Sequence, residues 1–373
     1  MAINIDGVFK ELVETGASDC YFTVGMPPVF RFSSKMEAQN CERLSDDDIN
    51  SILLALLEPD ALVEFESTLE YNTAIMWQGA RFRLNAFRQR KHAGIVLRRI
   101  KTEIPSLKQL GLPPVYGDLI LEKRGLVLVM GATGSGKSTS LAAMLEHRNT
   151  HGSGHVVTIE DPIEFIHEHN KCIFSQRDVG IDTYSFGIAL KNALRQSPDV
   201  IVIGEIRDRE TMEHAMNFSE TGHLCVATLH ANNANQAIER IVNFFPEERH
   251  KQILQNLSLN LRGVLTQRLL QNTHGERSIA LEIMLNKGLI RELIAEGRVQ
   301  EIHDLIEKGR DMGMQTFDQS LLDLYKEGMI TQAAALTESD HPGNLRLLIK
   351  QYEMGGNAGA MASMNNITLD NQF

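Results

Sequence analysis

Residues 131–139, GATGSGKST, carry the clearest chemical signal in the sequence. They match G-x-x-x-x-G-K-[ST], a pattern in which glycines let backbone N–H groups turn toward phosphates and the lysine reaches the β- and γ-phosphates. The serine hydroxyl of the pattern can ligate Mg²⁺, and a helix that begins near Lys137 adds its N-terminal dipole. We therefore expect ATP and Mg²⁺ to bind this loop, through Gly131, Ala132, Thr133, Gly134, Ser135, Gly136, Lys137, Ser138 and Thr139.

A carboxylate follows the apolar run Val200–Ile203, in the segment that begins Gly204-Glu205. The tip of a parallel strand is where ligands bind in such sheets, so Glu205 is the candidate for the second group on the metal, beside Ser138. The alternative is a solvated loop glutamate.

A second acidic tip follows the run Val156–Ile159, where Pro162 ends the strand and displays its neighbours on a turn. Phosphoryl transfer to water needs a residue that orients or deprotonates the water, and Glu164 is our candidate for it. Glu160 and Asp161 share the turn. Three acids so close together could also be surface charge.

Two histidines bracket a further apolar strand, CVATL. His230 lies at its C-terminal, ligand-facing end and is the candidate sensor of the γ-phosphate. His223 lies at the other end, and its functional and structural interpretations are equally open.

The composition describes an ordinary globular protein: 373 residues, formal net charge −11, 43% hydrophobic and 23% charged. The net negative charge argues against a protein that coats nucleic acid. Four scattered cysteines without a CxxC pair predict neither a zinc site nor disulfides, and favour a reducing compartment. We find no secretory signal at the N-terminus and no apolar run near the roughly 20 residues of a membrane span, so we expect a soluble, cytoplasmic protein.

The elements that must position these groups fall into four predicted segments. Residues 1–101 read as a small α+β domain, with a helix over 2–15, strands around a Pro-Pro turn, a helix capped by Ser45, and three strands in 69–100. Residues 102–117 are rich in Pro and Gly and predict a linker. Residues 118–353 predict an α/β ATPase domain with a parallel sheet, helical almost throughout from Pro246. Residues 354–373 predict a mobile tail.

Four motifs in this order, GATGSGKST, TIEDPIEF, DVIVIGEIRD and GHLCVATLHANNA, resemble the ATPases of the type II/type IV secretion and pilus superfamily. Within it the chain resembles the PilT/PilU group of type IV pilus retraction motors, including its N-terminal stretches ASDCYFTVGMPPVFR and RFRLNAF. The resemblance implies a RecA-like P-loop domain with a PAS-like N-terminal domain. It places Glu164 at the catalytic-base position and Glu205 at the Mg²⁺-side position.

The same resemblance implies partners. It implies a homohexamer, in which arginines of one N-terminal domain reach a neighbour's nucleotide; the matching positions are Arg83 and Arg98, with Arg81 a third candidate. These could also be solvated charges on a strand face. It further implies an inner-membrane pilus platform protein as a partner, with the chain peripherally associated with that machinery and binding no nucleic acid.

Two departures refine the resemblance. The chain lacks the paired-CxxC zinc site of assembly motors, which favours retraction over extension. The PilT signature AIRNL is replaced by residues 288–293, GLIREL, and with the segment 313–325 and the long tail this resembles PilU-type proteins, which assist a PilT-type motor.

Two other functions remain to be weighed against an ATP-driven motor. A nucleotide-gated scaffold would bind ATP and barely hydrolyse it, which the full set of Glu160, Glu164, Glu205 and His230 disfavours. A RecA-like helicase would bind DNA or RNA in a salt-sensitive manner, which the acidic balance disfavours.

Overall fold

The computed structural model describes residues 4–32, 35–100 and 103–364, and the chain folds as two compact units. The first contains residues 1–104 together with 164–166, and the second contains residues 105–163 and 167–373. Within the described residues, no helix combines the length and the apolar character needed to cross a membrane.

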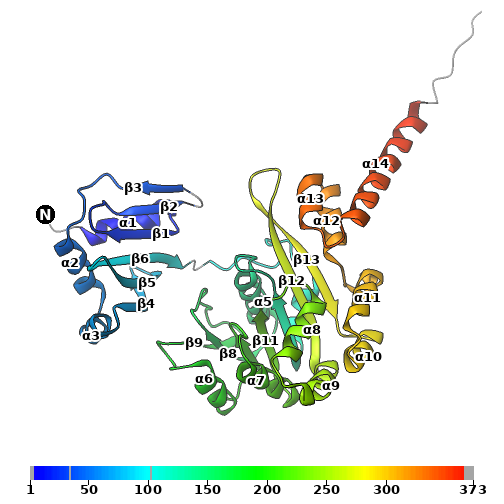
Figure 1. The fold of residues 1–373 in the computed structure, drawn as a ribbon, viewed down its shortest axis with the longest axis horizontal. Helices are drawn as coiled ribbons and strands as arrows, with labels where there is room; N and C mark the ends of the chain where they lie inside the picture. Colours follow the sequence, from blue (N-terminus) through cyan, green and yellow to red (C-terminus); the bar gives the residue numbers. More distant parts are fainter. Residues whose placement is uncertain (1–3, 33–34, 101–102, 365–373) are drawn as a thin grey trace, which may run out of the picture. The chain divides into compact units, whose positions relative to one another are not determined.

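The first unit is an antiparallel sheet covered by helices (Figure 1). The strands run in the order β3-β2-β1-β6-β5-β4, and Phe9 of helix α1 stacks on Trp77 and meets Phe82 edge-on in its core. Ser45 and Asp48 form the predicted capping box of α2. The elements are α1 (Ile5–Glu14), β1 (Asp19–Thr23), β2 (Val29–Phe32), β3 (Lys35–Ala38), α2 (Asp46–Leu56), α3 (Pro59–Thr68), β4 (Glu70–Trp77), β5 (Ala80–Gln89) and β6 (His92–Ile100).

The second unit is built on a seven-stranded sheet in the order β13-β12-β7-β11-β10-β8-β9. All neighbouring pairs are parallel except β12 with β13, which form an antiparallel hairpin. The predicted strands at Val156–Ile159, Val200–Ile203 and residues 225–229 are confirmed, and β7, β10 and β11 are buried along their whole length. The strands are β7 (Gly125–Met130), β8 (Gly154–Glu160), β9 (Cys172–Asp178), β10 (Val200–Ile203), β11 (Leu224–Leu229), β12 (Leu261–Gln271) and β13 (Arg277–Leu285).

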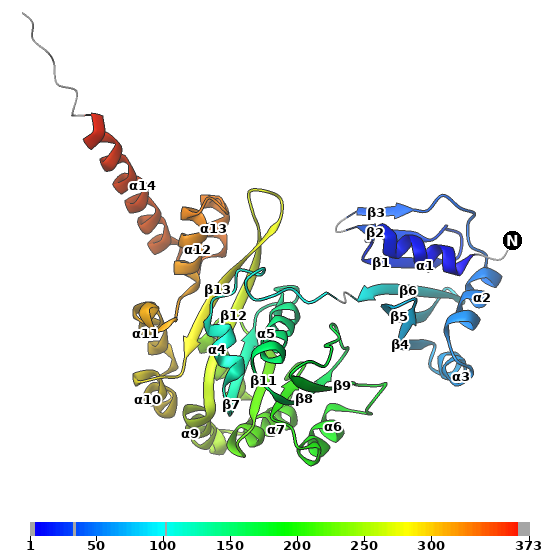
Figure 2. The same ribbon diagram turned by 180° about the vertical axis from the view of Figure 1, so that it is seen from behind.

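Helices cover both faces of this sheet (Figures 1 and 2). Helix α4 (Val115–Leu121) packs against α5 (Lys137–His151) on one face, whereas α7 (Arg209–Glu220), which packs on β7 and β11, and α8 (Ala234–Asn243) lie on the other. Helix α6 (Phe186–Ala193) contacts α7, and α9 (His250–Asn260) contacts α7, α8 and β12. Parallel strands joined in this way bring their carboxyl ends to one edge, where the predicted site residues gather.

The predicted linker of residues 102–117 is too long. Helix α4 already begins at Val115, Tyr116 is fully buried, and Leu112 belongs to the core of the second unit. Pro and Gly signal turns in this segment, but the leucines between them pack onto the core of the second unit.

The expectation of helix almost throughout from Pro246 is wrong for the β12–β13 hairpin. Both strands are buried over most of their length because they are covered on both faces, so their residues do not alternate between apolar and polar, and periodicity does not mark them as strands. Strand β12 lies directly beside β7, the strand that feeds the phosphate-binding loop.

The remaining C-terminal residues are helical, as predicted. Helices α10 (Leu289–Glu296) and α11 (Ile302–Lys308) precede α12 (Phe317–Lys326), α13 (Gln332–Glu338) and α14 (Pro342–Met364). The last three form a small core of their own with the end of the hairpin, which includes Leu270, Phe317 and Leu345. The predicted tail of residues 354–373 overlaps α14 as far as Met364, where Ala and Met support helix despite the glycines, and residues 365–373 lie outside the described part.

Candidate functional site

The loop of residues 131–136 connects β7 to α5 and has the backbone that its glycines permit. Gly131, Gly134 and Gly136 have φ angles of 140°, 79° and 89°. A Cβ on Gly131 would lie 2.4 Å from both the Gln267 carbonyl oxygen and Ser135 Oγ, so no larger residue fits there. The loop therefore leaves its backbone N–H groups at the start of a fifteen-residue helix, which suits a phosphate.

Lys137 is folded back on its own loop. Its Nζ donates to the carbonyl oxygens of Gly131 at 2.8 Å and Ala132 at 2.9 Å. His230, at the end of β11, brings Nδ1 to 3.2 Å from the same Gly131 oxygen. Two of the predicted phosphate-contacting side chains thus converge on one carbonyl group of the loop.

Glu205 follows β10 and lies between His230 and Arg207. Its Oε1 is 2.7 Å from His230 Nε2, and its Oε2 is 2.7 Å from a guanidinium nitrogen of Arg207. Because both ring nitrogens of His230 face acceptors, both contacts are hydrogen bonds only when both nitrogens carry protons. The chain continues from Arg207 to Asp161 at 3.5 Å, and the hydrogen bond to Glu205 is the main cause of the raised pKa of Arg207.

The acidic turn after β8 disperses its three carboxylates. Glu160 accepts a hydrogen bond from Thr158 Oγ1 at 2.7 Å, at the strand end, and Asp161 pairs with Arg207. Glycine at position 204 lets the residue after β10 pass close to the backbone of Glu160, since a Cβ there would lie 3.0 Å from Glu160 Cα. Glu164 is exposed and groups with the first unit, so its role at the phosphate-binding loop stays a prediction.

The candidate arginines lie in the first unit, on one face of its sheet. Arg83 and Arg98 are directly opposite in the register of β5 and β6, and Arg81 is two residues along β5. Arg98 Nε donates to Oδ1 of the buried Asp19 at 2.8 Å, and this hydrogen bond raises the pKa of Arg98. His223, whose role is open, lies at the end of β11 opposite to His230.

A cavity of about 450 Å³ lies beside the loop and exposes residues that the sequence did not suggest. Gln267 of β12 is fully buried and donates from Nε2 to the Ser135 carbonyl oxygen at 2.9 Å. The next residue, Arg268, also lines the cavity. Neither could be placed at the site while their segment was taken for a helix, since β12 shows no alternation of apolar and polar residues that would mark it as a strand. The cavity is lined by residues 131–135, 232, 233, 236, 267–269, 338 and 340.

The residues present fit a nucleotide with its magnesium ion. Ser135 Oγ and Gln267 Oε1 are buried beside the loop and have no hydrogen-bond partner among the described residues. No group of three or more His, Cys, Asp or Glu side chains in the described ranges could hold a metal alone. Mg²⁺ commonly binds through one or two protein oxygens together with substrate phosphates, so such an ion would need no larger cluster, and Ser138 and Glu205 stay its predicted ligands.

The chain is similar to known proteins named as ATPases, which agrees with a loop whose geometry suits a phosphate. The sequence model of the family described as "Type II/IV secretion system protein" matches residues 69–335. The type IV pilus ATPase PilU of Pseudomonas aeruginosa is 48% identical over 350 residues, covering 93% of this chain and 92% of that protein. PilT of the same organism, a type IV pilus retraction ATPase, is 40% identical over 330 residues, covering 88% and 96%.

A solved structure described as the pilus retraction motor PilT with bound ADP superposes with a TM-score of 0.88 at 40% identity, covering 92% of this chain and 99% of that one. The predicted mixed α/β fold with a smaller N-terminal domain and C-terminal helices is confirmed by this match.

Proposed function

Because the chain belongs to the type II/IV secretion system ATPases, and within them to the PilT/PilU group of pilus retraction ATPases, we propose that ATP hydrolysis at residues 131–138 powers or assists retraction of a type IV pilus. The observation that carries the proposal is that Lys137 and His230 both contact the Gly131 carbonyl oxygen of the loop, while Glu205 contacts His230. A phosphate-binding loop alone would suit any nucleotide-binding protein.

The contacts of the loop indicate how these residues exchange partners. The γ-phosphate replaces the carbonyl oxygens that Lys137 and His230 now contact, because phosphate oxygens are stronger acceptors for charged donors. His230 then connects the phosphate to Glu205, because its other ring nitrogen contacts the Glu205 carboxylate. Mg²⁺, when bound by Ser138 and Glu205, supplies neutralisation of the charge on the phosphates.

The remaining roles complete the proposal. Glu164 orients the attacking water, and Arg83 and Arg98 of one subunit stabilise the transition state at a neighbour's nucleotide in a homohexamer. The high similarity to PilU supports an accessory motor that acts with a PilT-type motor on an inner-membrane platform protein, from the cytoplasmic side.

Glu205→Gln and Lys137→Ala test the proposal. Each removes one charge from the site, and we expect each to lower steady-state ATP turnover at least about tenfold while circular dichroism and thermal melting stay unchanged. Glu292→Gln, which neutralises an exposed glutamate on α10, is the matched control and should retain full turnover. Wild-type turnover in Glu205→Gln would refute its role.

A nucleotide-gated scaffold is distinguished by the same assay. Such a protein would bind ATP and show negligible turnover both alone and with a PilT-type motor whose own phosphate-binding lysine has been replaced. We expect measurable turnover of this chain that rises in the presence of that inactivated motor.

A further inference from the structure

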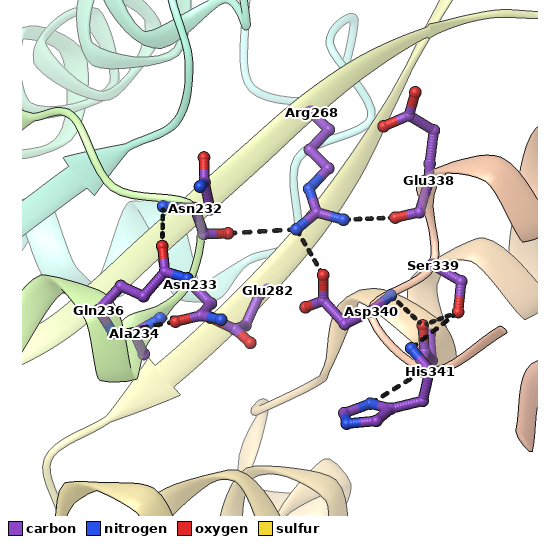
Figure 3. A network of polar contacts seen from close by, with 11 residues as sticks. Asn232, Asn233, Ala234, Gln236, Arg268, Glu282, Glu338, Ser339, Asp340 and His341 are labelled. Carbon is purple, nitrogen blue, oxygen red and sulfur yellow. Dashed lines mark hydrogen bonds and ion pairs between the residues drawn. The ribbon is translucent and has the colours of Figure 1, made fainter.

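Arg268 stands at the junction of three parts of the second unit (Figure 3). Its guanidinium donates to the Asn232 carbonyl oxygen at 3.3 Å, to Asp340 Oδ1 at 2.7 Å and to the Glu338 carbonyl oxygen. It also stacks on the Phe317 ring, with Cζ 3.9 Å from the ring centroid. One side chain therefore joins the segment after His230, the α13–α14 connection and helix α12.

The preceding residue ties the same strand to the phosphate-binding loop. Gln267 holds the Ser135 carbonyl oxygen, and its own carbonyl oxygen lies against Gly131. Successive residues of a strand face opposite sides, so the loop and the C-terminal helices are contacted by adjacent residues of one rigid element. A displacement of β12 at the loop is thereby a displacement of Arg268.

The segment of residues 232–234, which lies on the nucleotide side of Arg268, is bound by both Arg268 and Glu282. Glu282 of β13, which is buried, accepts the Ala234 N–H at 2.6 Å, two residues after the Asn232 carbonyl that Arg268 holds. Asn232 and Gln236 line the same cavity as the loop. A nucleotide in the cavity therefore meets a wall fixed by the Arg268 network.

The segment on the other side is organised by Asp318 of α12. Its carboxylate accepts from Ser339 Oγ at 2.6 Å, from the Asp340 N–H at 3.1 Å and from the His341 N–H at 3.2 Å. These bonds fix the start of α14. Helices α12 to α14 pack with the end of the β12–β13 hairpin in a core separate from the main core of the sheet, so they can shift together with the hairpin end while the main core stays packed.

We propose that Arg268 is a positioning residue that couples nucleotide occupancy of the loop to the placement of helices α12 to α14. The inference rests on the proposed function, since it requires a nucleotide at residues 131–138. Nucleotide binding orders the 232–236 wall, Arg268 transmits this to residues 338–341, and the α14 helix is the element whose position responds.

Amide hydrogen exchange of the full-length protein tests the coupling directly. Saturating a non-hydrolysable ATP analogue should slow exchange at residues 338–349 at least about fivefold in the wild type, and less than about twofold in Arg268→Gln. Nucleotide binding is measured in the same samples with a fluorescent ATP analogue. Arg310→Gln, which breaks a pair with Asp323 on the same helical group, is the control and should behave like the wild type.

Reciprocity supplies a second test at a residue outside the cavity lining. Asp318→Asn loosens residues 339–341 without touching the nucleotide, so coupling should make it weaken nucleotide binding by at least about fivefold. Asp323→Asn changes the same residue type on the same helix and should leave the affinity unchanged.

The outcomes separate the two proposals. If the wild-type protein binds no nucleotide, the proposed function is refuted. Normal binding with equal exchange protection in the wild type and Arg268→Gln, or with unchanged affinity in Asp318→Asn, refutes the coupling alone.

Discussion

Glu282→Gln should remove a pH dependence of stability that the wild-type protein carries. The Glu282 carboxyl is 2% exposed, and burial, together with the charges of Asp340 and Asp318, raises its pKa to about 7. The Ala234 N–H and Arg268 lower the pKa and only partly offset these effects. The group is therefore largely protonated in the folded protein at a pH where it is ionised in the unfolded chain.

The sign of the effect follows from proton uptake. Between about pH 4.5 and pH 7 the folded state binds one more proton at Glu282 than the unfolded state, so the free energy of unfolding falls as the pH rises. The stabilisation is complete below pH 4.5 and lost above pH 7, and amounts to about 3 kcal/mol for a shift of this size. Glutamine keeps an acceptor for the Ala234 N–H and does not titrate.

Urea unfolding of the wild type and Glu282→Gln at intervals from pH 4.5 to pH 8 measures this difference, because other titrating groups cancel between the two proteins. We expect the wild type to lose about 3 kcal/mol relative to the variant across the range. Glu276→Gln neutralises an exposed carboxyl in the same hairpin, and its curve should run parallel to the wild type. Parallel curves for Glu282→Gln as well would show that the buried carboxyl does not titrate as argued.

Two further substitutions test the loop and the first unit. Gly131→Ala forces a Cβ to within 2.4 Å of the Gln267 carbonyl oxygen at a φ of 140°, so it should weaken ATP-analogue binding at least about tenfold, whereas Gly275→Ala, with a positive φ and open space around it, should not; equal affinities would contradict the steric argument. Asp19→Asn removes the charge that Arg98 contacts and should destabilise the first unit by about 1–3 kcal/mol in calorimetry, and an unchanged melting profile would show that the pair contributes nothing.

The site could be predicted where a motif or a strand end carried the information. Glycines in the loop require positive φ angles, and Glu205 and His230 follow apolar strands whose carboxyl ends must meet at one edge. Arg207 follows Glu205 by two residues, but its pairing with Asp161 depends on the order of β8 and β10 in the sheet. Local patterns do not fix that order.

Other features depend on contacts that the sequence pattern does not encode. Strands β12 and β13 were hidden because both of their faces are covered, which erases the alternation of apolar and polar residues. Because β12 was not predicted, Gln267 and Arg268 were not identified as residues of the site. The role of Glu164, expected from its acidic turn and from the resemblance, and the roles of Arg83 and Arg98, which rest on the resemblance, stay predictions, since these residues lie in a different unit from the loop.

The alternation of Gln267 and Arg268 along β12 restricts which changes of chain length the hairpin can accommodate. Deleting or inserting one residue in the strand before Gln267 would turn each of these side chains to the opposite face and separate the loop from the helices at once. Residues 272–276, beyond both strands, carry no such restriction. Insertions and deletions among related sequences should therefore occur in this turn. The number of residues in β12 between the phosphate-binding loop and the turn should stay constant.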